Sequence, residues 1–246
     1  MTTRRVRMLT IAESELRQLL RNRAVLVTSF LMPMGVSAFF IHYRDLFASI
    51  GSLGYIGAVI VFTIGAFTLY TATVTTLAAR RQSLFLKRLR STATGDAAIL
   101  GGLMLPVAAI SLLQVIVILT AFAAVSGAPS DAPLLVAAVV STSAMMLALG
   151  VATAGITRSP EHAQVTTLPL SLGIIAVASW VGINGTEDMA VLKRLLPGGS
   201  ATEMILDGWN GGSPVTESAL LLVPTLAWVA VAIVLAATLF RWEPRR

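Results

Sequence analysis

The 246-residue chain contains no cysteine and little charge. Without cysteine it can form neither a disulfide framework nor a thiolate metal site. Charged residues make up 12% of the chain, whereas a soluble domain usually carries about 25%. The two histidines, His42 and His162, fall on opposite sides of the membrane in the topology that the charges predict. We therefore predict no metal site.

Motifs that carry catalysis are also missing. The sequence has no Gly-x-x-x-x-Gly-Lys-Ser/Thr loop for the phosphates of ATP, no His-Glu-x-x-His and no Gly-x-Ser-x-Gly. Its long apolar runs contain no ionisable side chain, which a proton- or sodium-coupled transporter usually needs. We predict that the chain is not an enzyme, has no catalytic residue and binds no cofactor itself. If it moves something uphill, the energy comes from another subunit.

The sequence does contain long apolar runs. Apolar residues make up 56% of the chain and gather in six uncharged runs. Each run is near or above the ~20 residues that a helix needs to cross a bilayer. The runs are Ala24–Ile41, Gly54–Ala78, Ala98–Val125, Pro133–Thr157, Ala163–Ile183 and Ser218–Phe240. They predict an all-α membrane protein in which six transmembrane helices form a single domain.

The distribution of charge predicts the orientation. With the N-terminus in the cytoplasm, fifteen of the eighteen Lys and Arg residues and five of the twelve acids lie inside, a net charge of +10. Only Arg44, Lys193 and Arg194 lie outside with seven acids, a net charge of −4. Cytoplasmic loops are enriched in Lys and Arg, so both termini are predicted to be cytoplasmic. The high pI thus reflects membrane orientation, and no nucleic-acid partner is predicted.

The first residues predict a cytoplasmic helix at the membrane surface. Within Thr2–Arg23, Ala12 and Leu16 fall on one helical face, and polar residues fall on the other. Glu13 and Arg17 form an i,i+4 pair in the favourable order. A disordered basic tail is the alternative interpretation.

The segment between the fifth and sixth runs, Asn184–Glu217, predicts two short helices that lie at or dip into the outer leaflet. The first ends at Pro197-Gly198-Gly199. Ser200 and Glu203 have the spacing of a capping box, which predicts the start of the second.

Between the second and third runs lies a short, strongly basic segment, Arg80–Gly95. Its five cations are interleaved with four large apolar side chains: Arg80, Arg81, Lys87, Arg88 and Arg90, with Leu84, Phe85, Leu86 and Leu89. A short amphipathic helix that docks into a groove on another protein uses both kinds of side chain. A positive-inside loop that fixes topology and does nothing else is the other interpretation.

The inner half of the second run carries hydroxyl groups. Thr68, Thr71 and Thr75 are predicted to share one helical face, with Tyr70 nearby. Such residues either line a wet path or hydrogen-bond between helices, and the second role is the commoner one. Gln114, deep in the third run, predicts an interhelical hydrogen bond.

The order of these elements resembles the membrane subunits of type-2 ABC exporters, the family that includes drug- and antibiotic-resistance permeases. The most specific local match is Leu86-Lys87-Arg88-Leu89-Arg90-Ser91-Thr92, which is similar to the family's Leu-Lys-Arg-Leu-Arg-x-Thr run. In that family the run forms the coupling helix, which inserts into the ATPase subunit. Family members often have Glu and Gly before the run and Pro after it; here Gln82, Leu84 and Ala93 stand at those places.

The resemblance implies a permease in a bacterial plasma membrane. Its partners are a separate P-loop ATPase, which holds ATP and Mg, and a second permease subunit, identical or paralogous. It implies that Glu13–Arg23 is the interfacial connecting helix, and that an amphiphilic or lipophilic cargo passes near the first, second and fifth spans. The residues expected at the ATPase interface are Arg81, Leu84, Phe85, Leu86, Lys87, Arg88, Leu89 and Arg90. Those expected along the cargo path are Thr68, Tyr70, Thr71 and Thr75.

Two other classes of function compete with this interpretation. The chain is alternatively an ATP-independent channel or facilitator, or a membrane immunity or assembly protein that sequesters a toxin without moving it. Neither needs an exposed apolar and cationic helix at the cytoplasmic surface, so the Arg80–Gly95 segment argues against both.

Overall fold

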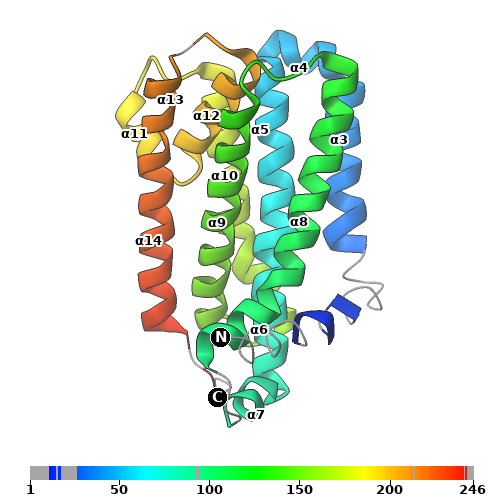
Figure 1. Ribbon diagram of the computed structural model, residues 1–246, viewed down its shortest axis with the longest axis vertical. Helices are drawn as coiled ribbons and strands as arrows, with labels where there is room; N and C mark the ends of the chain where they lie inside the picture. The colour runs from blue at the N-terminus through cyan, green and yellow to red at the C-terminus, as the bar shows by residue number, and fades with distance from the viewer. Residues whose placement is uncertain are drawn as a thin grey trace.

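The computed structural model describes residues 11–14, 16–17, 27–91, 95–212, 214–240 and 242. These residues form helices and no strands, which confirms the predicted all-α class. The long helices run side by side along one axis (Figure 1). Five of the described helices are long and apolar enough to cross a membrane: Leu53–Gln82, Asp96–Ser126, Ala132–Ile156, Pro160–Asn184 and Thr216–Leu239.

The first predicted span is described only in part. A π-helix, η1 (Val27–Leu31), leads into α3 (Met32–His42). The apolar helix Ser29–His42 is shorter than the ~20 residues of a spanning helix, and residues 18–26 lie outside the described part of the chain. Six spans and their orientation therefore stay predictions.

Most of the predicted surface helix also lies outside the described residues. Its described residues, 11–14 and 16–17, are helical. The predicted pair is present, because Arg17 Nη2 lies 2.7 Å from Glu13 Oε1.

A continuous helix of three parts forms the centre of the bundle. It consists of α5 (Leu53–Ile64), the π-helix η2 (Gly65–Tyr70) and α6 (Thr71–Gln82). Its side chains supply much of the buried core, including Ile56, Phe62 and Leu77. The helices that pack most extensively on it are α3, α8, α9, α10 and α12.

The π-helical part changes which residues share a face. A π-helix closes i→i+5 hydrogen bonds, so it holds an extra residue in the turn. Thr71 shows this spacing, since its hydroxyl donates to the carbonyl of Ala66, five residues earlier, at 2.8 Å. The prediction that Thr68 shares a face with Thr71 and Thr75 assumed an unbroken α-helix, and the π-helical part interrupts that spacing.

The short segment Ser126–Asp131 between the third and fourth runs predicts a tight turn and an antiparallel hairpin. α8 (Asp96–Ser126) and α9 (Ala132–Ile156) are joined at this turn. The turn ends at Asp131, whose carboxylate caps α9 by accepting from the Leu134 N–H at 2.9 Å. Close packing then fixes α9 against the central helix. A Cβ at Gly150 would lie 2.8 Å from Thr73 Cγ2, so only glycine fits there.

The two remaining long helices complete the bundle. α10 (Pro160–Asn184) begins after Ser159, whose hydroxyl accepts from the His162 N–H at 3.4 Å. α14 (Leu222–Leu239) packs mainly on α9 and is otherwise peripheral (Figure 1).

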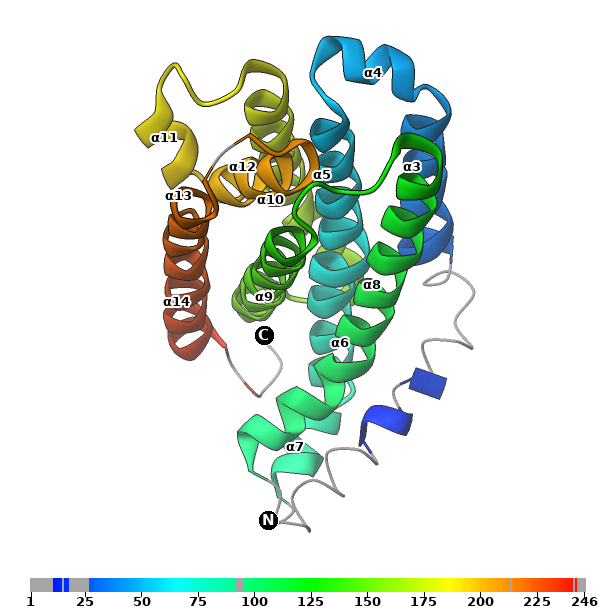
Figure 2. The ribbon, with the colours of Figure 1, turned by 45° about the horizontal axis from the view of Figure 1, so that its top comes forward.

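Short helices mark the two ends of the molecule (Figure 2). α4 (Arg44–Ile50), α11 (Ala190–Leu195), α12 (Gly199–Asn210) and α13 (Val215–Leu220) gather at one end, which we call the α12 end. α7 (Phe85–Arg90) lies at the opposite end, the α7 end.

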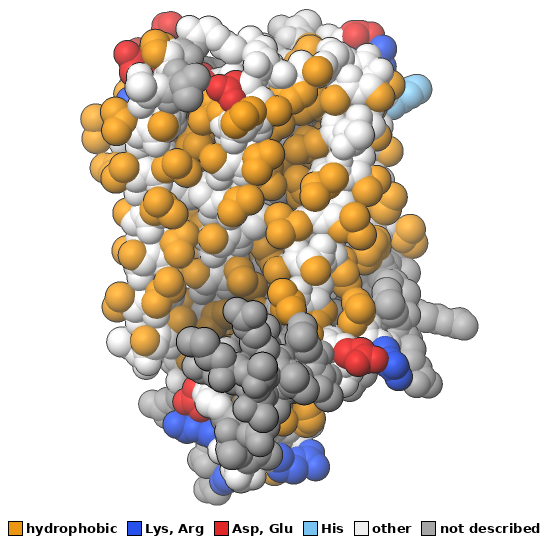
Figure 3. Space-filling view, in the orientation of Figure 1, with side chains coloured by type: hydrophobic (Ala, Val, Ile, Leu, Met, Phe, Trp, Pro, Cys, Tyr) orange, Lys and Arg blue, Asp and Glu red, His pale blue; other side chains and the backbone are white. Residues whose placement is uncertain are grey.

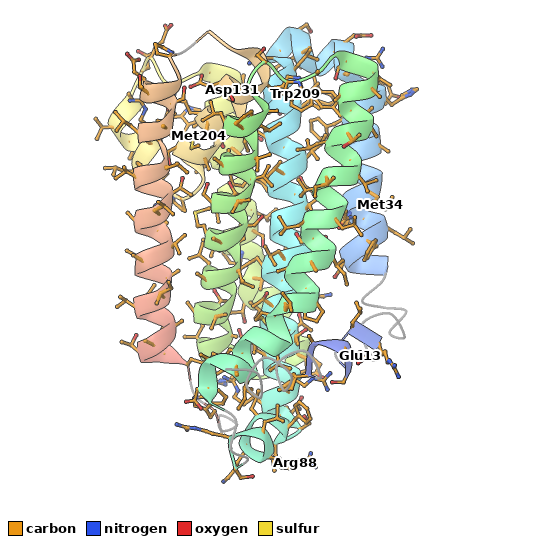
Figure 4. All side chains as sticks on the ribbon, viewed as in Figure 1. Glu13, Met34, Arg88, Asp131, Met204 and Trp209 are labelled. Carbon is orange, nitrogen blue, oxygen red and sulfur yellow. The ribbon has the colours of Figure 1, made fainter. Side chains whose placement is uncertain are left out.

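α12 fills the space between the tops of the long helices. Met204, Ile205 and Trp209 are buried, and Trp209 stacks on Phe122 of α8 at 4.6 Å between ring centroids (Figure 4). Asn210 Oδ1 accepts from the Gly54 N–H of α5 at 3.0 Å. α12 is thus held as part of the core.

Two short helices, α11 and α12, follow Asn184 as predicted, and their position in the outer leaflet stays a prediction. The predicted capping box is wrong. α12 begins after Gly198, whose φ of +93° suits glycine, and no side chain caps it. The Ser200 hydroxyl instead pairs with Thr225 at 3.0 Å, and Glu203 binds Arg194. The two side chains that the local pattern assigned to the cap therefore bind residues outside α12 instead.

The surface divides into an apolar middle and charged ends. Figure 3 shows hydrophobic side chains across the middle of the visible face, and acidic and basic side chains gathered near the two ends. Large exposed apolar residues on the long helices include Leu113, Ile116, Val165, Leu172, Leu226 and Val234. Such a surface is compatible with a multi-pass membrane protein.

Candidate functional site

The segment that leads into α7 has an unusual backbone. α6 ends at Gln82, and Leu84 then adopts φ +58° and ψ +12°, the left-handed conformation that glycine favours. Its carbonyl accepts from the Arg88 N–H at 3.0 Å, which starts α7. Leu84 is also 46% exposed, although it is a large apolar residue.

α7 presents different residues to the protein and to solvent. Leu86 is fully buried and belongs to the core, and Leu89 is half-buried. Lys87 and Arg88 are exposed, and Arg88 lies at the far tip of the molecule (Figure 4). The outward surface of the segment is therefore cationic, with Leu84 beside it.

Aromatic and acidic groups hold the flanks of α7. The Arg80 guanidinium lies 5.3 Å from the centroid of the Phe85 ring. Arg90 lies 5.1 Å from the centroid of the Trp242 ring, and its Nε is 3.3 Å from Asp96 Oδ1. These contacts attach α7 to α6, to the start of α8 and to the segment that follows α14.

Arg81 does not lie on the exposed surface, contrary to its prediction as an interface residue. Its side chain is 1% exposed, and its guanidinium donates to the carbonyls of Ala154, at 3.0 Å, and Thr157. Those carbonyls end α9, where the helix dipole also favours a cation. Arg81 thus attaches α6 to α9, and Leu86 attaches α7 to the core. Thr92 and Ala93 lie outside the described residues.

A cavity of about 760 Å³ lies between η1/α3, η2/α6 and α10. These helices correspond to the first, second and fifth predicted spans. The residues that line it come from all three: Ser29, Met32, Phe67, Thr71, Ala72, Thr75, Thr76, Pro160, Glu161, Gln164, Thr167, Leu168 and Ser171. Its volume falls in the range of about 300–1,000 Å³ that is common for small-molecule sites.

The structure separates the four residues predicted along a cargo path. Thr71 and Thr75 line the cavity. Thr68 is buried and donates to Gln114 Oε1 at 2.8 Å, and the Gln114 amide donates to the Phe30 carbonyl at 3.4 Å. The interhelical hydrogen bond predicted for Gln114 is therefore confirmed. Tyr70 is also buried, and its hydroxyl lies 3.0 Å from that of Thr153.

The residues that α10 contributes to the cavity were not predicted. Glu161, Gln164, Thr167 and Ser171 follow one another at spacings of three or four residues, so they form a polar stripe along one helical face. That spacing is visible in the sequence and identifies the stripe. What it cannot identify is the helix that the stripe faces.

The hydroxyl groups in the cavity differ in what they offer a ligand. Thr71, Thr75 and Thr167 donate to backbone carbonyls at 2.8, 2.9 and 3.2 Å, so their oxygens keep lone pairs that can accept. The Ser171 side chain is 1% exposed, and its hydroxyl has no hydrogen-bond partner among the described residues. An unsatisfied buried hydroxyl costs about 1–3 kcal/mol.

No protein-family model matches this chain, and no curated protein matches it either. Function is therefore inferred from α7, from the cavity and from the resemblance noted in the sequence.

Proposed function

We propose that this chain is the membrane permease subunit of an ATP-binding cassette exporter. In this proposal the exposed surface of α7 docks into a separate P-loop ATPase, two permease subunits pair, and an amphiphilic or lipophilic compound leaves the cell through them. ATP and Mg belong to the partner ATPase. The protein would reside in a bacterial plasma membrane with both termini in the cytoplasm.

The backbone at Leu84 carries the proposal. The family that the sequence resembles often has glycine at this position, and Leu84 holds the left-handed conformation that explains such a glycine. A left-handed non-glycine residue costs about 1–2 kcal/mol. Strain of this kind is characteristic of functional segments, and here it supports an α7 that is built to present a surface.

The composition of that surface also supports docking. Lys87 and Arg88 supply charge and Leu84 supplies exposed apolar area, while Leu86 fixes the helix to the core. A partner groove with acidic walls and an apolar floor is complementary to this arrangement. A loop that only set topology would need the charges but not the exposed leucine.

The connections of α7 suggest how a push on it would spread. Arg81 links the end of α6 to the end of α9, and Arg90 links α7 to Asp96 at the start of α8. A movement of α7 would therefore shift three long helices together. The cavity lies between α6 and α10, so a shift of α6 would alter its walls, as alternating access requires.

The direct test is gentle purification from native membranes with mass spectrometry of whatever stays bound. We expect a P-loop ATPase in roughly equal amount. Its absence, repeated after crosslinking in the membrane, would overturn the proposal and favour the channel or immunity alternatives.

A matched pair of substitutions locates the contact. Leu84→Asp removes the exposed apolar side chain in a backbone conformation that Asp tolerates, and we expect the ATPase to be lost. Met189→Asp is the control, because Met189 is also left-handed and exposed but lies at the α12 end. Equal retention of the ATPase by both variants would contradict docking through α7.

A further inference from the structure

The cavity between α6 and α10 has a chemical character that narrows the cargo. Glu161, in the first turn of α10, is the charged residue among the described residues that line it. It is exposed, and an exposed glutamate is ionised at neutral pH. Ser171 lies ten residues further along the helix, a distance of about 15 Å. The cavity is therefore acidic at one end and closed by a hydroxyl at the other.

The walls between these two residues favour a hydrogen-bond donor. The hydroxyl groups of Thr71, Thr75 and Thr167 already donate to backbone carbonyls, so what they present to a ligand is an acceptor oxygen. A carboxylate is also an acceptor only. Gln164 differs from these groups, because its amide carries N–H donors as well as an acceptor oxygen. A ligand rich in N–H donors matches the threonine and carboxylate oxygens, whereas a ligand that carries acceptors alone would place its lone pairs against theirs.

Apolar side chains cover the rest of the wall. Met32, Phe67 and Leu168 contribute to it from three different helices. They suit the hydrocarbon part of an amphiphile, since burial of apolar area is favourable by about 25 cal/mol per Å². The site thus combines an apolar surface, several acceptors and one negative charge.

From this combination we propose that the cavity selects amphiphiles whose polar group is a protonated amine. The inference rests on the proposed function in calling the ligand a cargo, but the binding itself requires only this chain. The ammonium group would lie toward Glu161 and share its N–H donors with the threonine oxygens. The Ser171 hydroxyl would gain a partner in a second polar group of the ligand or in a water carried with it.

The test measures binding to the purified chain in nanodiscs, without any ATPase. Three probes share one twelve-carbon tail: dodecylammonium, dodecyltrimethylammonium and dodecylsulfonate. Part of each probe dissolves in the lipid of the nanodisc and gives a background signal. This background is measured with the variant Thr75→Phe, in which a ring fills part of the cavity, and is subtracted. Ala72→Phe, at a neighbouring lining position, is a second blank if Thr75→Phe fails to purify as a single species.

We expect dodecylammonium to bind about tenfold more tightly than dodecyltrimethylammonium, which keeps the charge but has no N–H donor. We expect dodecylsulfonate to bind more weakly than either cation. Glu161→Gln should remove most of the preference for cations over the sulfonate, by about tenfold, whereas Glu217→Gln, the same change at the α12 end, should leave it intact.

Results of two kinds would overturn the proposal. The first is tighter binding of the sulfonate, which would mean that the many cations of the α7 end govern the site. The second is a dodecylammonium affinity no higher than that of its trimethyl analogue, or a preference that Glu161→Gln leaves unchanged. Co-purification of an ATPase is a separate readout, so this proposal and the proposed function can fail independently.

Discussion

The same four residues, Leu-Lys-Arg-Leu, occur in two short helices at opposite ends of the molecule. They are Leu86–Leu89 in α7 and Leu192–Leu195 in α11. Each helix has six residues, and each follows a left-handed, exposed apolar residue, Leu84 or Met189. Local sequence thus produces nearly the same helix twice.

The surroundings of the two helices make their cations different. In α11, Lys193 is 2% exposed, donates to the Gly185 carbonyl at 2.7 Å and lies 5.0 Å from the centroid of the Trp180 ring. Arg194 binds Glu203 through two hydrogen bonds of 2.6 and 2.7 Å, and this carboxylate raises the pKa of Arg194. In α7, by contrast, Lys87 and Arg88 are exposed, although Arg88 Nη2 also donates to a backbone carbonyl, that of Ser83, at 2.9 Å.

A short basic helix can present its charges to a partner only when the fold leaves them exposed, as it does for Lys87 and Arg88 in α7. At the α12 end a carbonyl, an aromatic ring and a carboxylate take up the two cations. In the predicted topology Lys193 and Arg194 are exceptions to the positive-inside rule, and the pairing of Arg194 and the burial of Lys193 account for such exceptions. The same four residues therefore carry exposed cations at the α7 end and cations that bind other groups of the protein at the α12 end.

The largest expected effect concerns partner binding. Reversing both exposed charges of α7, with Lys87→Glu and Arg88→Glu, should weaken association with the proposed ATPase by about 100-fold or more, since like charges would then face an acidic groove. Association is measured by pull-down of the ATPase from solubilised membranes. The thermal midpoint should stay near that of the wild type. If the double variant still retains the ATPase, the exposed cations of α7 do not bind this partner.

The next effect concerns stability. Lys193→Met removes a buried cation from its carbonyl and its aromatic ring and should destabilise the protein by about 2–3 kcal/mol. Lys87→Met, the same change at the matching position of α7, should cost less than ~0.5 kcal/mol because Lys87 is exposed. Thermal unfolding in detergent compares the two. Equal shifts would show that the two lysines do not differ as their burial indicates.

A smaller effect is expected at the ion pairs. Glu203→Gln breaks the two-point contact with Arg194 and should cost about 1 kcal/mol, a value reduced because the Arg194 side chain is 43% exposed. Asp96→Asn acts on the Arg90 pair of α7, whose side chains are 54% and 47% exposed, and should cost less than ~0.5 kcal/mol. Both losses are measured by thermal unfolding at low and high salt. A larger loss of stability in Asp96→Asn than in Glu203→Gln would contradict the expectation that the less exposed ion pair contributes more.

The smallest effect should be the same at both ends. Leu84→Asn and Met189→Asn relieve the left-handed backbone and should each stabilise the protein by about 0.5–1 kcal/mol. Thermal unfolding measures both, and pull-down of the ATPase then separates them, since only Leu84→Asn removes apolar area from the proposed interface. Destabilisation by either substitution would mean that the side chain contributes more than its backbone strain costs.

Much of the fold could be predicted from the sequence because apolar length alone determines where a helix can cross a membrane. The second to sixth runs coincide with the five long helices, and the turn between α8 and α9 lies where Gly127 and Asp131 predicted it. What the sequence could not show is which neighbour competes for a side chain. Ser200 and Glu203 fit a capping box, but Thr225 and Arg194 lie close enough to bind them instead.

The candidate site was predicted less completely for the same kind of reason. Arg80 and Arg81 are adjacent and chemically identical, and only the position of α9 decides that Arg81 points inward. Thr71 and Thr75 were predicted along the path, but the π-helical turn before them moved Thr68 elsewhere. A stripe of polar residues on α10 was visible in the sequence, yet its meaning depended on the cavity that α6 forms with it.

The burial of Arg81 has a consequence for how the protein is made. Its carbonyl partner at Ala154 lies 73 residues later in the chain. At about 5–20 residues per second, the ribosome delivers that partner roughly 4–15 s after Arg81. During this interval α9 is absent, so Arg81 cannot make its native contacts with the end of that helix. The buried contact between α6 and α9 therefore forms only after residue 154 has been synthesised. In a chain that keeps Arg81 and carries Ala78→Cys, one helical turn earlier and also buried, arrest before Ala154 should leave the cysteine open to a water-soluble thiol reagent, and arrest well beyond it should not.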